Sequence, residues 1–164
     1  MNETSVHVCR VSTPDGLKDY VTVEPPEVTF SKGLTAEGIV GVLLRPLKAE
    51  ERITPENFAP NRAFVALLNA VVAQHGPDQP GFRAEAERVG DGFIYIIDQR
   101  TPKPQGSVPP EDIIGAFEAA GGKVVPGSYQ ANGKHMILSP AGFFRLEGEL
   151  NQCLLREIAS RTRV

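Results

Sequence analysis

The clearest pattern in the chain is a helical repeat of apolar side chains over residues 62–75. Five apolar residues recur at helical spacing and share one face: Phe64, Leu67, Leu68, Val71 and Val72. Asn61 precedes the stretch as a candidate N-cap, and Gly76 followed by Pro77 is a typical stop signal. The pattern predicts an amphipathic helix whose apolar face packs on the core.

Two further stretches show helical spacing. Residues 143–162 carry the apolar positions Leu146, Leu150, Cys153, Leu154 and Ile158, with Ser139-Pro140 as an upstream start signal. Residues 80–89 fit a shorter and more polar helix, which the glycines at 90 and 92 would end. We expect the C-terminal helix to pack against a sheet.

Alternating apolar and polar residues predict strands at 6–12, 20–23 and 28–30, the last two separated by Pro25-Pro26. Residues 38–44 are apolar on both faces, which is typical of a buried strand. Residues 93–98 are rich in β-branched and aromatic side chains. We expect this last strand to lie at the centre of the sheet.

Residues 113–120 fit a short helix or a strand equally well. We favour the strand, because Gly121-Gly122 offers a hairpin turn and short apolar segments follow, separated by Pro126-Gly127 and Asn132-Gly133. These segments predict a meander of three short strands. The proline-rich segment at about 101–112 predicts an extended loop that links two halves of one domain, which would span residues 1–164.

Taken together, these elements predict an α+β fold. We expect a single antiparallel-rich sheet with two main helices packed on one face. No internal repeat, heptad series or low-complexity segment modifies this expectation.

Charge and composition narrow the classes of partner. The net charge is −3, with 17 basic and 20 acidic side chains, and Lys and Arg do not cluster as phosphate-backbone binding requires. We therefore expect no nucleic-acid partner. The two cysteines are too few for a disulfide framework, and neither a secretory signal nor an apolar run of about 18 residues is present. These features predict a cytoplasmic protein with no membrane partner.

No familiar catalytic, metal or cofactor motif occurs in the sequence. His7 and Cys9 share a face of the first predicted strand, and with His135 or Cys153 they would supply zinc ligands. Their spacing matches no recognised zinc pattern. We therefore expect no metal and no cofactor.

A dense set of hydrogen-bonding side chains surrounds the predicted turn at Asn132-Gly133. Its members are Ser128, Tyr129, Gln130, Asn132, Lys134 and His135. Neighbouring residues on a strand point to opposite faces, so the six cannot all converge on one ligand. Asp98 and Arg100 end the strand at 93–98, where the chain enters the proline-rich loop. If Asp98 approaches His135, the carboxylate would orient the imidazole as a general base.

Three functions compete at this stage. The favoured one is an interaction module for a protein partner or a small ligand, with Ser128, Tyr129, Gln130, Asn132, Lys134 and Arg100 as candidate binding residues. The alternative is a small metal-independent hydrolase-like enzyme in which His135 and Asp98 are catalytic. The third is a homodimer formed through an edge strand near residues 21–30 or through the C-terminal helix.

Overall fold

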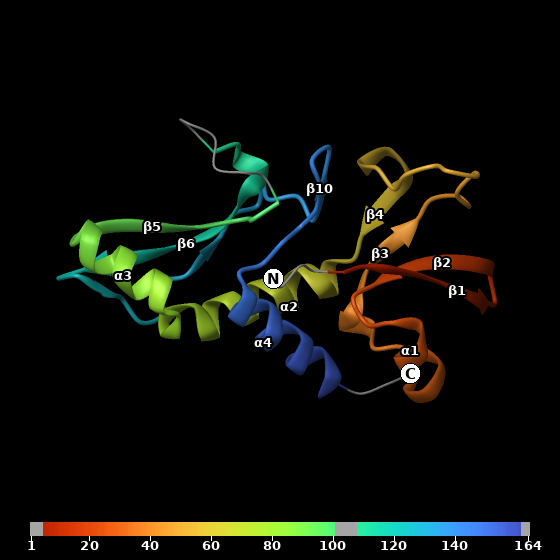
Figure 1. The fold of residues 1–164 in the computed structure, drawn as a ribbon, viewed down its shortest axis with the longest axis horizontal. Helices are drawn as coiled ribbons and strands as arrows, with labels where there is room; N and C mark the ends of the chain where they lie inside the picture. The colour runs from red at the N-terminus through yellow and green to blue at the C-terminus, as the bar shows by residue number, and fades with distance from the viewer. Residues whose placement is uncertain (1–4, 101–107, 162–164) are drawn as a thin grey trace.

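The computed structural model describes residues 5–100 and 108–161. Within these ranges the chain forms four α-helices and three separate antiparallel sheets of four, four and two strands. The expected single sheet with two helices on one face is therefore wrong. Figure 1 shows the two larger sheets at opposite ends of the molecule, with helix α2 (Arg62–His75) running between them and α4 (Gly148–Ala159) beside it.

The first sheet is built from the N-terminal part of the chain. Its strands, in spatial order, are β1 (His7–Thr13), β2 (Gly16–Thr22), β3 (Ile39–Leu43) and β4 (Phe58–Pro60). The strand predicted at 28–30 is wrong, because these residues lie in helix α1 (Pro26–Lys32). Pro26 suits the first helical position, and Glu27 in the first turn and Lys32 in the last complement the helix dipole.

The second sheet is centred on β6 (Ile113–Ala120), so the strand predicted at 113–120 is confirmed. On one side β6 pairs with β5 (Gly92–Ile97), and on the other it pairs with β7 (Lys123–Val124) and β8 (Gln130–Ala131). The predicted three-strand meander is therefore replaced by two short strands that both pair with β6. The third sheet is a small hairpin of β9 (Leu138–Ser139) and β10 (Gly142–Phe143).

Strand β5 lies at the edge of the second sheet. The prediction that it lies at the centre of the sheet is therefore wrong. The physical reason is that its apolar residues are buried on one face only. Ile94 and Ile96 face the core and are each 2% exposed, whereas Phe93 and Tyr95 face outward and are 55% and 57% exposed. A continuous apolar run therefore gave the appearance of a strand covered on both faces.

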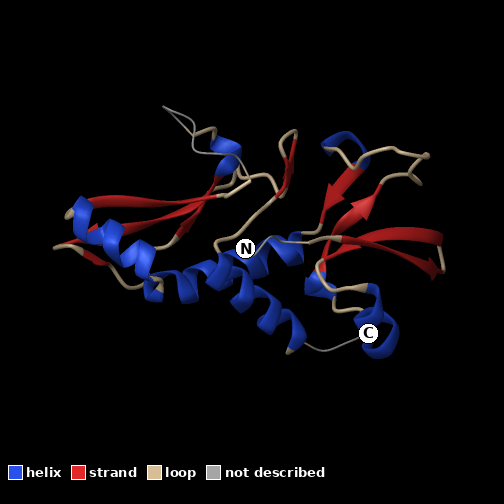
Figure 2. Ribbon diagram, in the orientation of Figure 1, coloured by secondary structure: helices blue, strands red, loops and turns tan. Residues whose placement is uncertain are grey.

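Two of the four helices, drawn in blue in Figure 2, agree closely with the sequence pattern. Helix α2 spans the predicted residues, and the Asn61 side chain accepts a hydrogen bond from the Ala63 N–H at 3.2 Å as its N-cap. Helix α3 (Pro80–Val89) also occurs as predicted. Helix α4 begins at Gly148, later than expected, because the preceding residues form β10 and an extended segment. Four short 3-10 turns complete the elements: η1 (Ala36–Gly38), η2 (Pro55–Asn57), η3 (Gly76–Asp78) and η4 (Pro110–Asp112).

A hydrophobic core joins both larger sheets through α2 and α4. The predicted apolar face of α2 is buried in full, and the rings of Phe64 and Phe144 pack with their centroids 5.3 Å apart. In the described part of the chain, no helix combines the length and apolar character that crossing a bilayer requires. The segment at 101–107, which covers most of the predicted proline-rich loop, lies outside the described residues.

Candidate functional site

The structure brings the candidate pair Asp98 and His135 into contact. Asp98 follows β5 directly, and its Oδ2 lies 3.0 Å from Nε2 of His135. Its Oδ1 accepts hydrogen bonds from the backbone N–H groups of Arg100, at 3.1 Å, and Arg145, at 2.8 Å. Because an ionised carboxylate only accepts hydrogen bonds, Nε2 is the ring nitrogen that donates. The imidazole is thus held in one orientation.

Arg100 is an internal cross-link, since its side chain is only 1% exposed. Its Nε donates to Asp112 Oδ1 at 2.8 Å, and Nη1 and Nη2 donate to the carbonyls of Met136 and Glu111, each at 2.7 Å. Nη1 also donates to the Gly142 carbonyl at 3.2 Å. These partners supply the hydrogen bonds that a buried guanidinium requires. Arg100 therefore ties the end of β5 to the start of β6 and to the β9–β10 hairpin.

His135 lines a small pocket of about 190 Å³, although its own side chain is only 5% exposed. All the other lining residues are apolar: Pro55, Phe58, Pro60, Val65, Met136, Ile137 and Leu138. Asp98 would orient the imidazole for proton transfer. Among the described residues that line this pocket, no hydroxyl, thiol or second titratable group faces the imidazole.

The polar residues near Asn132-Gly133 do not converge on one site. Ser128 Oγ donates to the Val125 carbonyl at 2.7 Å and accepts from the Glu118 N–H at 3.0 Å, so it holds a turn. Asn132 Nδ2 donates to the carbonyls of Pro110 and Ile113, both at 2.8 Å. Gln130 and Lys134 are exposed.

Tyr129 is directed inward. Its hydroxyl donates to Asn69 Oδ1 of α2 at 2.6 Å, and its ring packs on Phe117 with the centroids 5.1 Å apart. Burial raises the pKa of this phenol above its usual value, because the phenolate would lose its hydration. The hydroxyl thus links β6 and β8 to α2 and is not presented to a ligand.

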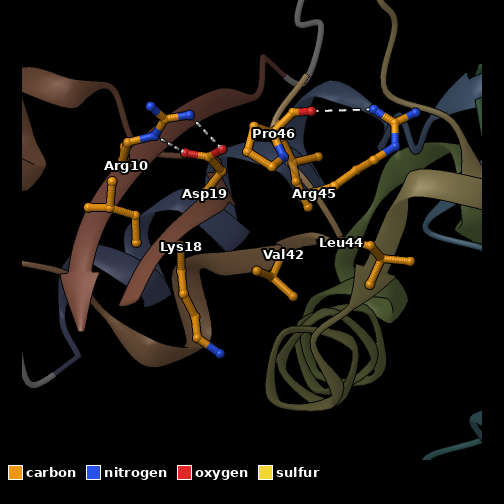
Figure 3. A pocket seen from close by; sticks show the side chains of 9 residues that line it. Arg10, Lys18, Asp19, Val42, Leu44, Arg45 and Pro46 are labelled. Atoms are coloured by element: carbon orange, nitrogen blue, oxygen red, sulfur yellow. Dashed lines mark hydrogen bonds and ion pairs between the residues drawn. The ribbon is translucent and has the colours of Figure 1, made fainter. Parts of the chain in front are cut away.

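A charged pocket of about 450 Å³ lies on the first sheet (Figure 3). Arg10 donates from Nε to Asp19 at 2.8 Å, and Arg45 donates to the Pro46 carbonyl at 3.3 Å and to Glu51. Arg10 lowers the pKa of the Asp19 carboxyl, and hydrogen bonds from Arg45 lower the pKa of Glu51 to about 2. Both arginines are therefore already neutralised by carboxylates of the chain itself.

The candidate metal ligands at the N-terminus are in the first sheet. His7 and Cys9 lie on β1, at its outer edge, and Cys153 is buried in α4. Over residues 5–100 and 108–161, no group of three His, Cys, Asp or Glu side chains is arranged to hold a metal ion.

A feature that the sequence pattern did not identify is the open edge of β5. Both peptide groups of Glu118 point away from β5, because its carbonyl accepts from the Val125 N–H at 2.8 Å and its N–H donates to Ser128. Phe93 lies opposite Glu118, so the two do not exchange hydrogen bonds and the peptide groups of Phe93 point outward. Because the direction of the peptide groups along a strand repeats every two residues, the peptide groups of Tyr95 also point outward.

The open edge borders a groove of about 520 Å³ between β5 and α3. Its apolar lining comes from Phe82 and Val89 of α3 and from Phe93 and Tyr95 of β5. No other strand of the described residues pairs with β5 on this side. The sequence contains a signal for this edge, since no residue from Gly92 to Ile97 is charged, but such an uncharged run predicts a central strand equally well.

Comparison with family models, with curated protein sequences and with solved structures gave no match to this chain. Its function has to be inferred from the geometry of the edge, the groove and the buried polar network.

Proposed function

We propose that this protein is an interaction module that binds an extended segment of a protein partner by adding it as a strand to the open edge of β5. The observation that carries the proposal is the direction of the peptide groups at Phe93 and Tyr95. These peptide groups point away from β6, and no described strand pairs with β5 on that side. Such unpaired groups are a template for strand addition, in which main-chain hydrogen bonds provide the affinity.

The side chains around this edge suit a protein ligand. Phe93 and Tyr95 are large apolar groups left more than half exposed, and aromatic residues are enriched at protein interfaces. The groove beside them is lined in part by Phe82 and Val89 of α3. Alternate side chains of an added strand would enter this groove and provide specificity.

The edges of the first sheet are less suited to this role. Strand β1 carries Arg10 at its centre, and a charged residue in an edge strand opposes pairing. Strand β4 has only three residues and includes Pro60, which lacks a backbone donor. Compared with these two edges of the first sheet, the edge of β5 is longer than that of β4 and carries no charged residue or proline.

The hydrolase-like alternative has less support. His135 and Asp98 form the pair that a general base requires, but the pocket beside His135 is otherwise lined by apolar side chains. Arg100, which follows Asp98 closely in the chain, is saturated by Asp112 and by backbone carbonyls. The pair is explained as part of the buried network that supports the end of β5.

Strand addition can be tested by NMR on the ¹⁵N-labelled full-length protein. The probes are soluble nine-residue peptides of alternating apolar and polar residues, each with a version that is N-methylated at alternate amides. We expect amide shift changes concentrated at Phe93, Tyr95 and the neighbouring residues of β5. N-methylation of the peptide amides that face β5 should abolish these shift changes, because it removes the hydrogen-bond donors of the peptide and keeps its backbone from approaching β5 closely.

The variant Tyr95→Pro provides the matched test within the protein. It removes an N–H that points away from β6, so it spares the pairing of β5 with β6 while blocking an added strand. Tyr95→Ala is the control that keeps this N–H. We expect binding to weaken about tenfold or more in Tyr95→Pro relative to Tyr95→Ala. Equal binding by the two variants, or shift changes confined to another surface, would refute the proposal.

A further inference from the structure

We infer that the strand added to β5 is the β5 of a second copy of this chain, in an antiparallel pair whose two-fold axis passes next to Ile94. This inference rests on the proposed function and specifies the partner for the same edge. A closed two-fold contact uses the same surface on both copies, so the edge has to be complementary to itself.

The order of residues in β5 meets that requirement. With Ile94 opposite Ile94 of the partner subunit, Phe93 lies opposite the partner's Tyr95, and Tyr95 lies opposite the partner's Phe93. Phe93 and Tyr95 are the two residues whose peptide groups point outward, so each of these pairs exchanges two backbone hydrogen bonds. A register shifted by one residue would place outward peptide groups opposite inward ones.

The same register covers the exposed aromatic rings. Across the joined sheet, the row of outward side chains runs from Glu118 through Phe93 to the partner's Tyr95 and then to Ala116 of the partner subunit. Each phenylalanine thus lies beside a tyrosine, and cross-strand aromatic pairs are favourable. No two like charges are adjacent in this row.

The charges beside the edge also permit two copies to approach. No residue from Gly92 to Ile97 is charged. Of the charged residues that line the groove, Arg88 of α3 is bonded to Glu85, and Asp98 is buried against His135. The edge of β1 differs, because it carries a charged residue, and a two-fold pairing centred on Arg10 would place two Arg10–Asp19 ion pairs at the new contact.

Sedimentation velocity over a range of concentrations tests the inference on the full-length protein and three variants. The wild type is expected to show a reversible monomer–dimer equilibrium. The double variant Phe93→Lys/Tyr95→Lys places like charges opposite each other in the proposed register. We expect its dimer to be weakened about 100-fold or more. Both positions are exposed, so the fold tolerates these changes, which circular dichroism verifies.

The second double variant, Phe93→Lys/Tyr95→Glu, isolates the register. In the pair centred on Ile94, the introduced lysine at position 93 faces the introduced glutamate at position 95 of the other copy. This variant is expected to retain the dimer that the double lysine variant loses. The control is Val8→Lys on the edge of β1, which should dimerise like the wild type.

Three outcomes would overturn the inference. They are a wild type that stays monomeric at several hundred micromolar, a double lysine variant that dimerises as well as the wild type, and a lysine/glutamate variant as monomeric as the double lysine one. A monomeric wild type whose β5 amides still respond to the probe peptides contradicts self-pairing and leaves the proposed function intact. A monomeric wild type with no such response contradicts both.

Discussion

Asp112 and Arg100 form a buried ion pair in which Arg100 Nε donates to Asp112 Oδ1 at 2.8 Å and both side chains are at most 4% exposed. The pair joins the residues that follow β5 to the 3-10 turn that precedes β6. The ion pair therefore holds together the ends of β5 and β6, and β5 is the strand that carries the open edge. Removal of either partner would leave a charge without its counterpart in the protein interior.

Replacement of Arg100 by Met is therefore expected to lower the free energy of unfolding by about 3–5 kcal/mol, as is typical when one partner of a buried ion pair is removed. Chemical denaturation followed by circular dichroism measures the loss. The matched control is Arg10→Met, which removes the exposed member of the ion pair with Asp19 and should cost far less. Equal losses for the two variants would contradict the structural role assigned to Arg100.

The hydrogen bond between Asp98 and His135 predicts the state of the imidazole. Since Nε2 and not Nδ1 lies within hydrogen-bond distance of the Asp98 carboxylate, we expect Nε2 to be the ring nitrogen that carries the proton of the neutral tautomer. Long-range ¹H–¹⁵N correlation spectra of the three histidines report the protonation of each ring nitrogen. An unprotonated Nε2 in His135 would show that the contact is not the one described. His75, at the C-terminal end of α2, provides the internal comparison.

Gly115 is predicted to tolerate no side chain. A Cβ at this position would lie 2.4 Å from the Tyr129 hydroxyl and 2.7 Å from the Gln130 carbonyl oxygen, where β8 approaches β6. We expect Gly115→Ala to lower the free energy of unfolding by about 1–3 kcal/mol through overpacking. The control is Gly133→Ala, because a Cβ there has no neighbour within 4 Å, and its effect should be within about 1 kcal/mol of neutral. A neutral Gly115→Ala variant would contradict the close approach.

Tyr129 predicts a loss of stability at alkaline pH. Burial raises its pKa in the folded protein, whereas in the unfolded chain the phenol ionises near its ordinary value of about 10. Above that pH the unfolded state releases a proton that the folded state keeps, so stability falls as pH rises toward the folded pKa. Denaturation of the wild type between pH 9 and 11 (about one unit on each side of the ordinary value) should show a steeper decline than Tyr129→Phe. Parallel declines would contradict the burial of the hydroxyl.

Helices α2 and α3 were predictable from the sequence, because the signals that define them lie within a few neighbouring residues. The apolar face of α2, its Asn61 cap and the Gly76-Pro77 stop all belong to one short stretch. Local signals failed at Pro26–Lys32, where β-branched residues suggested a strand. There the proline and the charges at the two ends of the segment favoured a helix over the weak preference of its central residues.

The candidate site was predictable only in part. Asp98 and His135 were identified as a possible pair from their chemistry, and they do lie in contact, although their catalytic role stays a prediction. The polar residues around Asn132 were grouped because they are close in sequence. Their hydrogen bonds to Asn69, Pro110 and Val125 are contacts whose geometry only the folded chain sets. The open edge is not predictable from the residues of β5, because the same apolar run also fits a central strand.

By itself, the sequence determined which stretches become the main helices and most strands, because helix caps, turn residues and apolar periodicity act over a few residues. The tertiary structure alone decided how strands pair and how many sheets they form. Gly92–Ile97 would serve as a central or an edge strand with the same residues. Its place depends on which segments compete for each side of β6, and β7 and β8 occupy the far side. That competition among distant segments leaves the peptide groups of Phe93 and Tyr95 facing outward.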